Sequence, residues 1–133
     1  MDKNYVILFE CKNGESEVKK VECQGSVVTE QELCGLIGCE HIQTQQPSEP
    51  LGSKCILVFD ADNQSKQELA PTPLASILYG YCRTGKYLRG NVVCCKSNEK
   101  QEVLAYSSIK ASSVVLQMEA SKAMASLVDF KVE

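Results

Sequence analysis

The sequence has no tryptophan and only one histidine, His41. A single imidazole leaves one candidate for acid–base chemistry by histidine, the side chain best suited to it near neutral pH. No stretch approaches the roughly 20 consecutive apolar residues that a membrane-spanning helix needs. The first residues precede only the short apolar run Tyr5–Phe9, with no small-residue cleavage site, and so do not predict a signal peptide. These absences predict a cytoplasmic protein with no membrane partner.

Basic residues are fewer than acidic ones, 14 against 17, and the formal net charge is −3. Binding to duplex nucleic acid depends on many Lys and Arg side chains that neutralise phosphates, so this charge argues against such a partner. Hydrophobic residues make up 44% of the 133 positions and charged residues 23%, the usual balance of a globular protein. We therefore expect a single domain over residues 1–133 that folds without a disulfide or a metal.

Cysteine, by contrast, is abundant, with eight residues, yet no two are spaced as a CxxC pair. Cys55 precedes Ile56, and Cys94 and Cys95 follow Val93, so several thiols belong to apolar runs. A cytosolic start and thiols within apolar runs predict that all eight are reduced and pack as small hydrophobic side chains.

No group of residues predicts catalysis or metal binding. The Gly80–Tyr87 stretch matches the P-loop pattern except at its last position, where Tyr87 replaces the Ser or Thr that holds Mg²⁺. Asp60 and Asp62 resemble the start of a calcium loop, but the later Gly and Glu are missing, and a plain turn is expected. Three possible metal ligands have no CxxC pair to complete a zinc site: Cys34, Cys39 and His41. Four serines have no His/Asp partner set that would make a nucleophile: Ser107, Ser108, Ser112 and Ser113. We predict no enzyme, no metal and no cofactor.

Two hairpins are predicted from alternating apolar runs and turn residues. Tyr5–Phe9 and Val18–Cys23 flank Asn13-Gly14, the strongest short hairpin signal. Asn91–Lys96 and Glu102–Tyr106 flank a polar turn in the same way. Between the hairpins, the continuous apolar run from Cys55 to Phe59 predicts a central strand covered on both faces, and Glu40–Thr44 predicts a short strand.

Two short helices are predicted between these strands. Thr29 and Glu32 form a capping box, and Gly38 follows the helical apolar residues as a C-terminal cap. Pro73 fits the first turn of a second short helix that ends near Leu78.

Near the C-terminus, helical spacing predicts an amphipathic helix with an apolar face of Leu116, Ala120, Ala123, Met124, Leu127 and Val128. Val114–Leu116 is compatible with either strand or helix. The predicted fold class is α+β, with a small, mainly antiparallel sheet, two short helices and the C-terminal amphipathic helix. The apolar helix face and the strand edges predict a homo-oligomer.

The stretch from Tyr79 to Arg89 is the strongest candidate for a ligand site. Tyrosines and basic residues alternate there, and the predicted ligand-binding residues are Tyr79, Tyr81, Arg83, Lys86, Tyr87 and Arg89. Residues 71–98 contain no acidic residue and carry a formal charge of +4, which leaves −7 for the rest of the chain. Arg binds phosphate bidentately and aromatic rings stack on bases, so the pattern predicts a site for a phosphorylated ligand with solvent-facing arginines. In the alternative interpretation the tyrosines pack in the core and the basic groups are solvated at an edge.

Residues from about Val21 to about Val93 resemble an uncharacterised family of small proteins from Firmicutes and their phages. The resemblance is carried by Leu33–Gly38, Glu40–Ile42, Ile56–Asp60, Pro71–Ser76 and Leu88–Val93. The paired glycines that end the helix in the family are separated here, as Gly35 and Gly38. The resemblance implies a phage or mobile-element accessory protein in a bacterial cytoplasm, and it supplies no catalytic residues.

Two functions are compatible with these observations. The first is a non-enzymatic protein that binds and sequesters a small phosphorylated, nucleotide-type ligand, as an anti-defence sponge does. The second is an adaptor or inhibitor that binds a host protein through strand edges or the C-terminal helix.

Overall fold

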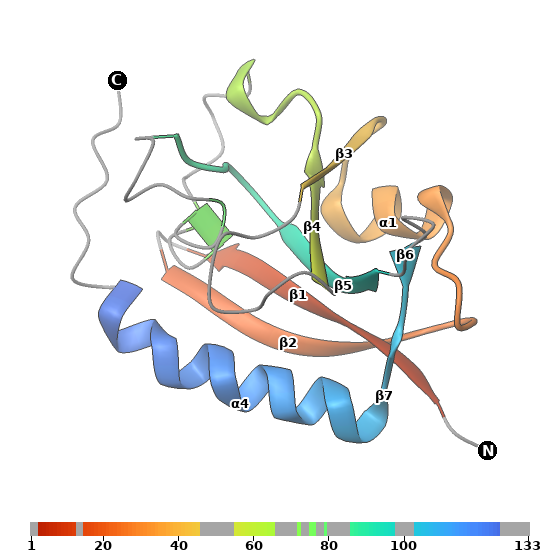
Figure 1. Ribbon diagram of the computed structural model, residues 1–133. Helices are drawn as coiled ribbons and strands as arrows, with labels where there is room; N and C mark the ends of the chain where they lie inside the picture. Colours follow the sequence, from red (N-terminus) through yellow and green to blue (C-terminus); the bar gives the residue numbers. More distant parts are fainter. Residues whose placement is uncertain are drawn as a thin grey trace.

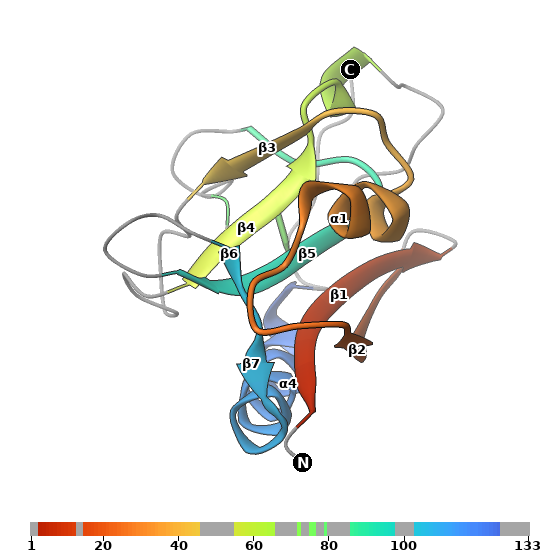
Figure 2. The same ribbon diagram turned by 90° about the vertical axis from the view of Figure 1, so that its right-hand side faces the viewer.

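The computed structural model describes residues 3–12, 15–45, 55–65, 72, 75–76, 79, 86–97 and 103–125. Within these residues the strands form a seven-stranded sheet in the order β2-β1-β5-β4-β3, with β6 beside β5 and β7 beside β1. Every named strand pair is antiparallel. Helices α1 and α4 cover opposite faces of the sheet (Figures 1 and 2). The predicted α+β class, with a mainly antiparallel sheet and a C-terminal helix, is confirmed.

The first hairpin consists of β1 (Asn4–Lys12) and β2 (Glu15–Cys23), with Lys12 opposite Glu15. Both strands are longer than the apolar runs that predicted them. β1 is buried on both sides, because Ile7 and Phe9 join the core under α4 while Val6 and Leu8 join the core under α1. An apolar run without alternation is what such a doubly covered strand requires.

Helix α1 (Glu30–Ile37) begins and ends where local signals predicted. The Thr29 side chain accepts a hydrogen bond from the Glu32 N–H at 3.2 Å. The Glu32 carboxylate reaches beyond the cap and accepts from the Gln24 N–H at 3.2 Å. At the other end, Gly38 adopts a left-handed conformation with φ of 81°, which glycine tolerates best, and its N–H donates to Cys34 O at 2.8 Å.

The predicted central strand is β4 (Cys55–Asp60), which lies between β5 and the edge strand β3 (Ile42–Gln45). Leu57 and Phe59 face the α4 side and Val58 faces the α1 side. A turn follows β4 and continues into the short 3₁₀ helix η1 (Asn63–Ser65). The sequence predicted the strands β3 and β4, the burial of β4 on both faces and the turn after it, and the structure contains all of them.

The second hairpin was predicted only in part. β5 (Val92–Ser97) pairs with β6 (Val103–Leu104), but the chain then leaves β5, and β7 (Tyr106–Ser107) pairs with β1 instead. The single return strand that was predicted is thus two short strands, of which β6 pairs with β5 and β7 pairs with β1. The physical reason is that β1 and β5 pair directly only at Ile7–Phe9, so the start of β1 is available to β7.

Helix α4 (Ser108–Ala125) shows that Val114–Leu116 is helical. The Ser107 side chain accepts a hydrogen bond from the Lys110 N–H at 3.3 Å and so caps the start of the helix. The face toward the sheet carries the buried residues Ala111, Val114 and Met118.

Leu116, on the predicted apolar face of α4, is 71% exposed, and the side chains of Ala120, Ala123 and Met124 are not described. Leu127 and Val128 lie outside the described residues. In the predicted second short helix, Ala75 and Ser76 are helical, and the Ser76 N–H donates to Thr72 O at 2.9 Å. Its ends, Pro73 and Leu78, lie outside the described residues.

Candidate functional site

Buried polar side chains gather at one end of the sheet, around the end of β4. Among the described residues, five polar or charged side chains are buried, and they are Asp60, Asn63, Thr72, Ser76 and Arg89. Buried polar groups need hydrogen-bond partners, so such a cluster marks a place where the fold holds a segment in a defined position. Here that segment is the chain leading into β5, which contains three of the predicted ligand residues.

The turn after β4 provides the first anchor of this segment. Asp60 Oδ1 accepts a hydrogen bond from the Asp62 N–H at 2.9 Å, and Asn63 Nδ2 donates to Asp60 O at 3.0 Å. These contacts form an Asx-type turn, as expected in place of a calcium loop. The other amide atom, Asn63 Oδ1, accepts from the Arg89 N–H at 3.2 Å. The turn and the segment before β5 are therefore joined through one amide side chain.

Thr72 and Ser76 provide the second anchor from the opposite side of the segment. The Leu88 N–H donates to Ser76 Oγ at 2.9 Å, and Leu88 O accepts from the Thr72 N–H at 2.9 Å. The Thr72 hydroxyl donates to Gly90 O. Gly90 has a φ of 78°, a conformation that side chains disfavour, so glycine is needed there. The backbone of residues 88–90 is thereby fixed on both sides of Arg89.

Arg89 and Tyr87 form a stacked pair on this anchored backbone. The guanidinium carbon lies 5.2 Å from the centroid of the Tyr87 ring, and Arg89 Nη2 donates to the Tyr87 hydroxyl at 2.9 Å. Arg89 is only 4% exposed, which corrects the expectation that it faces solvent. Burial follows from the anchoring, because the hydrogen bonds to the backbone on either side draw residue 89 inward. Lys86, just before the pair, is exposed.

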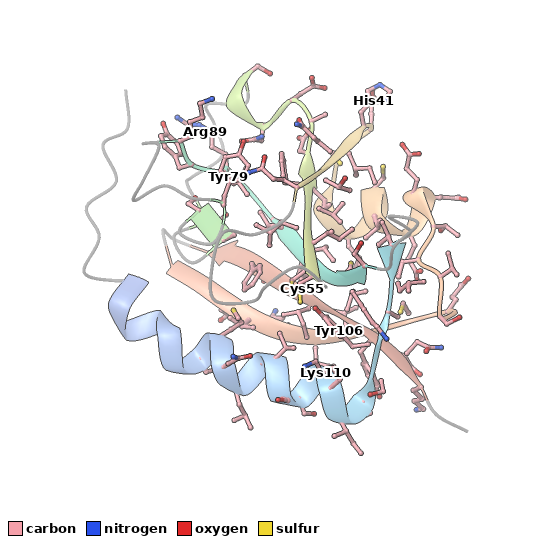
Figure 3. All side chains as sticks on the ribbon, in the orientation of Figure 1. His41, Cys55, Tyr79, Arg89, Tyr106 and Lys110 are labelled. Carbon is pink, nitrogen blue, oxygen red and sulfur yellow. The ribbon has the colours of Figure 1, made fainter. Side chains whose placement is uncertain are left out.

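Tyr79 belongs to the core side of the region rather than to the pair. Its ring meets Phe59 edge-on, with centroids 5.4 Å apart and an interplanar angle of 84°. Figure 3 shows Tyr79 and Arg89 near the same end of the molecule, with His41 away from them. Tyr81 and Arg83 lie outside the described residues. Of the six predicted residues, Tyr87 and Arg89 contact each other and Lys86 precedes them in the chain, while Tyr79 packs as the alternative interpretation expected.

A pocket of about 580 Å³ lies at the C-terminal end of α1 and is lined by Cys34, Gly35, Gly38, Cys39, Glu40 and Asp62. Its charged groups are carboxylates, which repel phosphate. Cys34 and Cys39 do meet here, as a metal site would need, but His41 is not part of the lining. Within the described part of the chain, no three His, Cys, Asp or Glu side chains are arranged to hold a metal ion.

A cluster of thiols around Tyr106 was not anticipated as a site. The Tyr106 hydroxyl lies 3.2 Å from Cys55 Sγ, 3.7 Å from Cys94 Sγ and 3.1 Å from Cys95 O. A hydrogen bond from the Cys94 thiol, together with the Tyr106 hydroxyl and the charge of Lys110, lowers the pKa of Cys55 to about 6, although burial opposes this. Sequence reasoning treated these cysteines as inert, since no spacing signal connects residues on β4, β5 and β7.

The six cysteines whose side chains are described form no disulfide with one another. Cys11 and Cys82 have no described side chains. No helix within the described ranges has the length and apolar content needed to cross a membrane.

Comparison of the chain with protein-family models, curated proteins and solved structures finds no match.

Proposed function

We propose that this protein is a non-enzymatic binding protein that sequesters a small phosphorylated, nucleotide-type ligand beside the Tyr87–Arg89 pair. The observation that carries the proposal is the anchored backbone of residues 88–90, which holds an aromatic ring and a cation together. Binding sites gain affinity when their groups are ordered in advance, because less entropy is lost on association. In the bacterial setting implied by the family resemblance, such a protein acts as a phage anti-defence sponge in the cytoplasm.

Each member of the segment has a distinct role in this proposal. The exposed Lys86 contacts phosphate, and the half-buried ring of Tyr87 stacks on a base. Arg89 is mostly buried and acts as a positioning residue that holds the Tyr87 ring. Positions 71–98 contain no acidic residue, so no carboxylate of this segment competes with an anion for its basic groups.

The roles predict a specific order of effects. Thermal-shift screening against cyclic and linear nucleotides identifies a ligand, and calorimetric titration then measures its affinity for variants. Lys86→Ala should weaken binding about 10-fold or more, with melting temperature nearly unchanged, because one charge-assisted contact is worth about 1.5–3 kcal/mol. Lys3→Ala is the matched control, since Lys3 is also an exposed lysine and lies at the start of the sheet.

Arg89→Ala should reduce both affinity and stability, because it removes a buried group with hydrogen bonds to its neighbours. Tyr87→Phe keeps the ring and should retain most of the binding, whereas Tyr87→Leu should lose it. If Lys86→Ala and Tyr87→Leu both bind every screened ligand as the unmodified chain does, the proposed site is wrong.

A second candidate function, an adaptor that binds another protein, is favoured by the outer face of α4. Ile109 is 86% exposed and Leu116 is 71% exposed, and their spacing of seven residues puts them on one line along the helix. Adjacent exposed apolar side chains on one helix face are typical of interaction surfaces. The predicted homo-oligomer would cover this face with a second copy of the chain.

Light scattering at micromolar concentration tests whether a second copy of the chain covers the outer face of α4. A mass above 14.6 kDa that returns to the monomer value in the Ile109→Lys, Leu116→Lys double variant assigns the face to self-association. A monomeric unmodified chain rejects the homo-oligomer and leaves the face for a different protein.

A further inference from the structure

The thiol cluster on the α4 side of the sheet lies apart from the proposed ligand segment and has its own chemistry. Cys55 is the first residue of β4 and is directly opposite Lys96 in the ladder with β5. Cys94, two residues before Lys96, points to the same face of the sheet. Tyr106 comes from β7, and its hydroxyl contacts both sulfur atoms. Figure 3 shows Cys55, Tyr106 and Lys110 following one another from the sheet to the first turn of α4.

The hydrogen-bond inventory of this cluster shows which group can carry a negative charge. The Tyr106 hydroxyl has one proton but two close acceptors, Cys95 O at 3.1 Å and Cys55 Sγ at 3.2 Å. When Cys55 is a thiol, its S–H can donate to the Tyr106 oxygen while the hydroxyl donates to the carbonyl. When Cys55 is a thiolate, the hydroxyl can rotate to donate to the sulfur. The cluster therefore accommodates both protonation states of Cys55 without moving the backbone.

The surrounding groups favour the ionised state of Cys55 and the neutral state of its neighbours. The neighbouring Cys94 thiol, the Tyr106 hydroxyl and the Lys110 charge lower the pKa of Cys55 and so favour its thiolate. Lys96 lies opposite in the ladder with a second positive charge. The same arrangement, with burial, raises the pKa of Cys94 and of Tyr106, so both keep their protons. One thiolate and one protonated thiol thus lie around the same Tyr106 hydroxyl.

We infer that Cys55 is a peroxide-sensitive nucleophile and that Cys94 is its resolving thiol. The Cys55 sulfur attacks one peroxide oxygen, the O–O bond breaks, and the released hydroxide takes a proton to form water. Cys55 is oxidised by two electrons to a sulfenic acid as the peroxide is reduced. The Cys94 sulfur then attacks the sulfenic sulfur, the S–O bond breaks, and hydroxide leaves as water with the Cys94 proton. The product is a Cys55–Cys94 disulfide, which a dithiol reductant returns to the starting state.

The opposite face of the sheet supplies matched controls within the same molecule. Cys23 and Cys95 are also buried, but they lie in the apolar cluster under α1. Burial is the main cause that raises the pKa of each of these thiols. They should remain unreactive under conditions in which Cys55 is modified.

The test is the pH profile of alkylation, resolved by peptide mass spectrometry so that each cysteine is followed separately. Between pH 7.5 and 6.0 the Cys55 rate should fall about 2-fold, because most of it stays ionised, whereas an ordinary thiol should slow about 30-fold. Tyr106→Phe should move the Cys55 profile toward the ordinary one. An unmodified chain whose Cys55 slows about 30-fold, as an ordinary thiol does, or is not alkylated at all, contradicts the inference.

Oxidation of the unmodified chain gives a second readout, to which one variant adds a check. One equivalent of hydrogen peroxide should convert the reduced protein to a species lacking two hydrogens, with Cys55 and Cys94 in one disulfide-linked peptide pair. In Cys94→Ala the sulfenic acid should persist and be trapped by dimedone at Cys55. A peroxide-treated chain in which the oxidised residues are other cysteines, with Cys55 untouched, would overturn the proposal.

Discussion

The two faces of the sheet bury the same type of residue in opposite chemical surroundings. Under α4, Cys55 and Cys94 contact the hydroxyl of Tyr106. Under α1, Cys23 and Cys95 lie among Val, Leu and Ile side chains. The pKa of Cys55 is lowered to about 6, while the pKa of Cys95 is raised by desolvation. Burial alone therefore does not decide the direction in which the pKa of a cysteine shifts. A neighbouring thiol and a hydroxyl lower it despite burial.

The largest expected effect follows from removing the side chain at the centre of the α4 face. Tyr106 is among the largest fully buried side chains, so Tyr106→Ala should lower the free energy of unfolding by about 3–5 kcal/mol. Leu33→Ala on the α1 face should cost about 2–5 kcal/mol through apolar packing alone. Urea denaturation in reducing buffer measures both. Tyr106→Phe, which keeps the ring, should cost less than either; an equal loss would mean that the hydroxyl dominates.

Replacing a cysteine by serine should lower the free energy of unfolding by a different amount on each face of the sheet. Both losses should be smaller than those above. Cys95→Ser puts a hydroxyl in an apolar cluster and should cost about 1–3 kcal/mol, the cost of a buried polar group without a good partner. Cys55→Ser puts its hydroxyl beside that of Tyr106 and should cost less than about 1 kcal/mol. Paired denaturation curves check the order. Equal losses would show that the α4 face is as apolar as the α1 face.

The smallest expected difference between the two faces is in how their cysteines make the free energy of unfolding depend on pH. The lowered pKa of Cys55 means that the unfolded chain binds more protons than the folded chain between about pH 6 and the ordinary value of 9.0. Cys55 therefore contributes stability that is present above pH 9 and is lost as the pH falls through 6. The raised pKa values of Cys23 and Cys95 act with the opposite sign, and their contribution is lost as the pH rises above about 9.

The Cys55 contribution can be isolated by comparing the unmodified chain with Cys55→Ser across this range. The difference in unfolding free energy between the two should grow from pH 6 to pH 8.5, because only the unmodified chain has the titrating thiol. A difference that stays constant with pH would mean that Cys55 titrates alike in the folded and unfolded states.

Local signals in the sequence predicted the elements whose formation depends on neighbouring residues. Asn13-Gly14 predicted the hairpin of β1 and β2, and Thr29 and Gly38 predicted both ends of α1. The apolar run at Cys55–Phe59 predicted a doubly covered strand. In each case the physical cause, a turn conformation, a cap or two-sided burial, acts within a few residues of the signal.

The predictions were wrong or incomplete where the burial of a side chain depends on segments that are distant in the sequence. Both sides of α4 carry apolar residues, so periodicity could not tell whether Val114 and Met118 or Leu116 would meet the sheet. The basic segment raised the same problem, because Arg89 is a surface residue by type but is drawn inward by the hydrogen bond that its N–H donates to Asn63 Oδ1 and by flanking contacts. The thiol cluster had no signal at all, since its members are separated by up to 51 positions.

The sequence by itself determined the class of the fold, because strand and helix periodicity, turn residues and caps are local properties of the chain. Only the tertiary structure decided which cysteine has a lowered pKa and which helix face is buried. It also placed Arg89 beneath the Tyr87 ring. These outcomes depend on pairings between β4, β5, β7 and α4, and contact between distant residues, unlike a turn or a cap, leaves no pattern in the order of the amino acids.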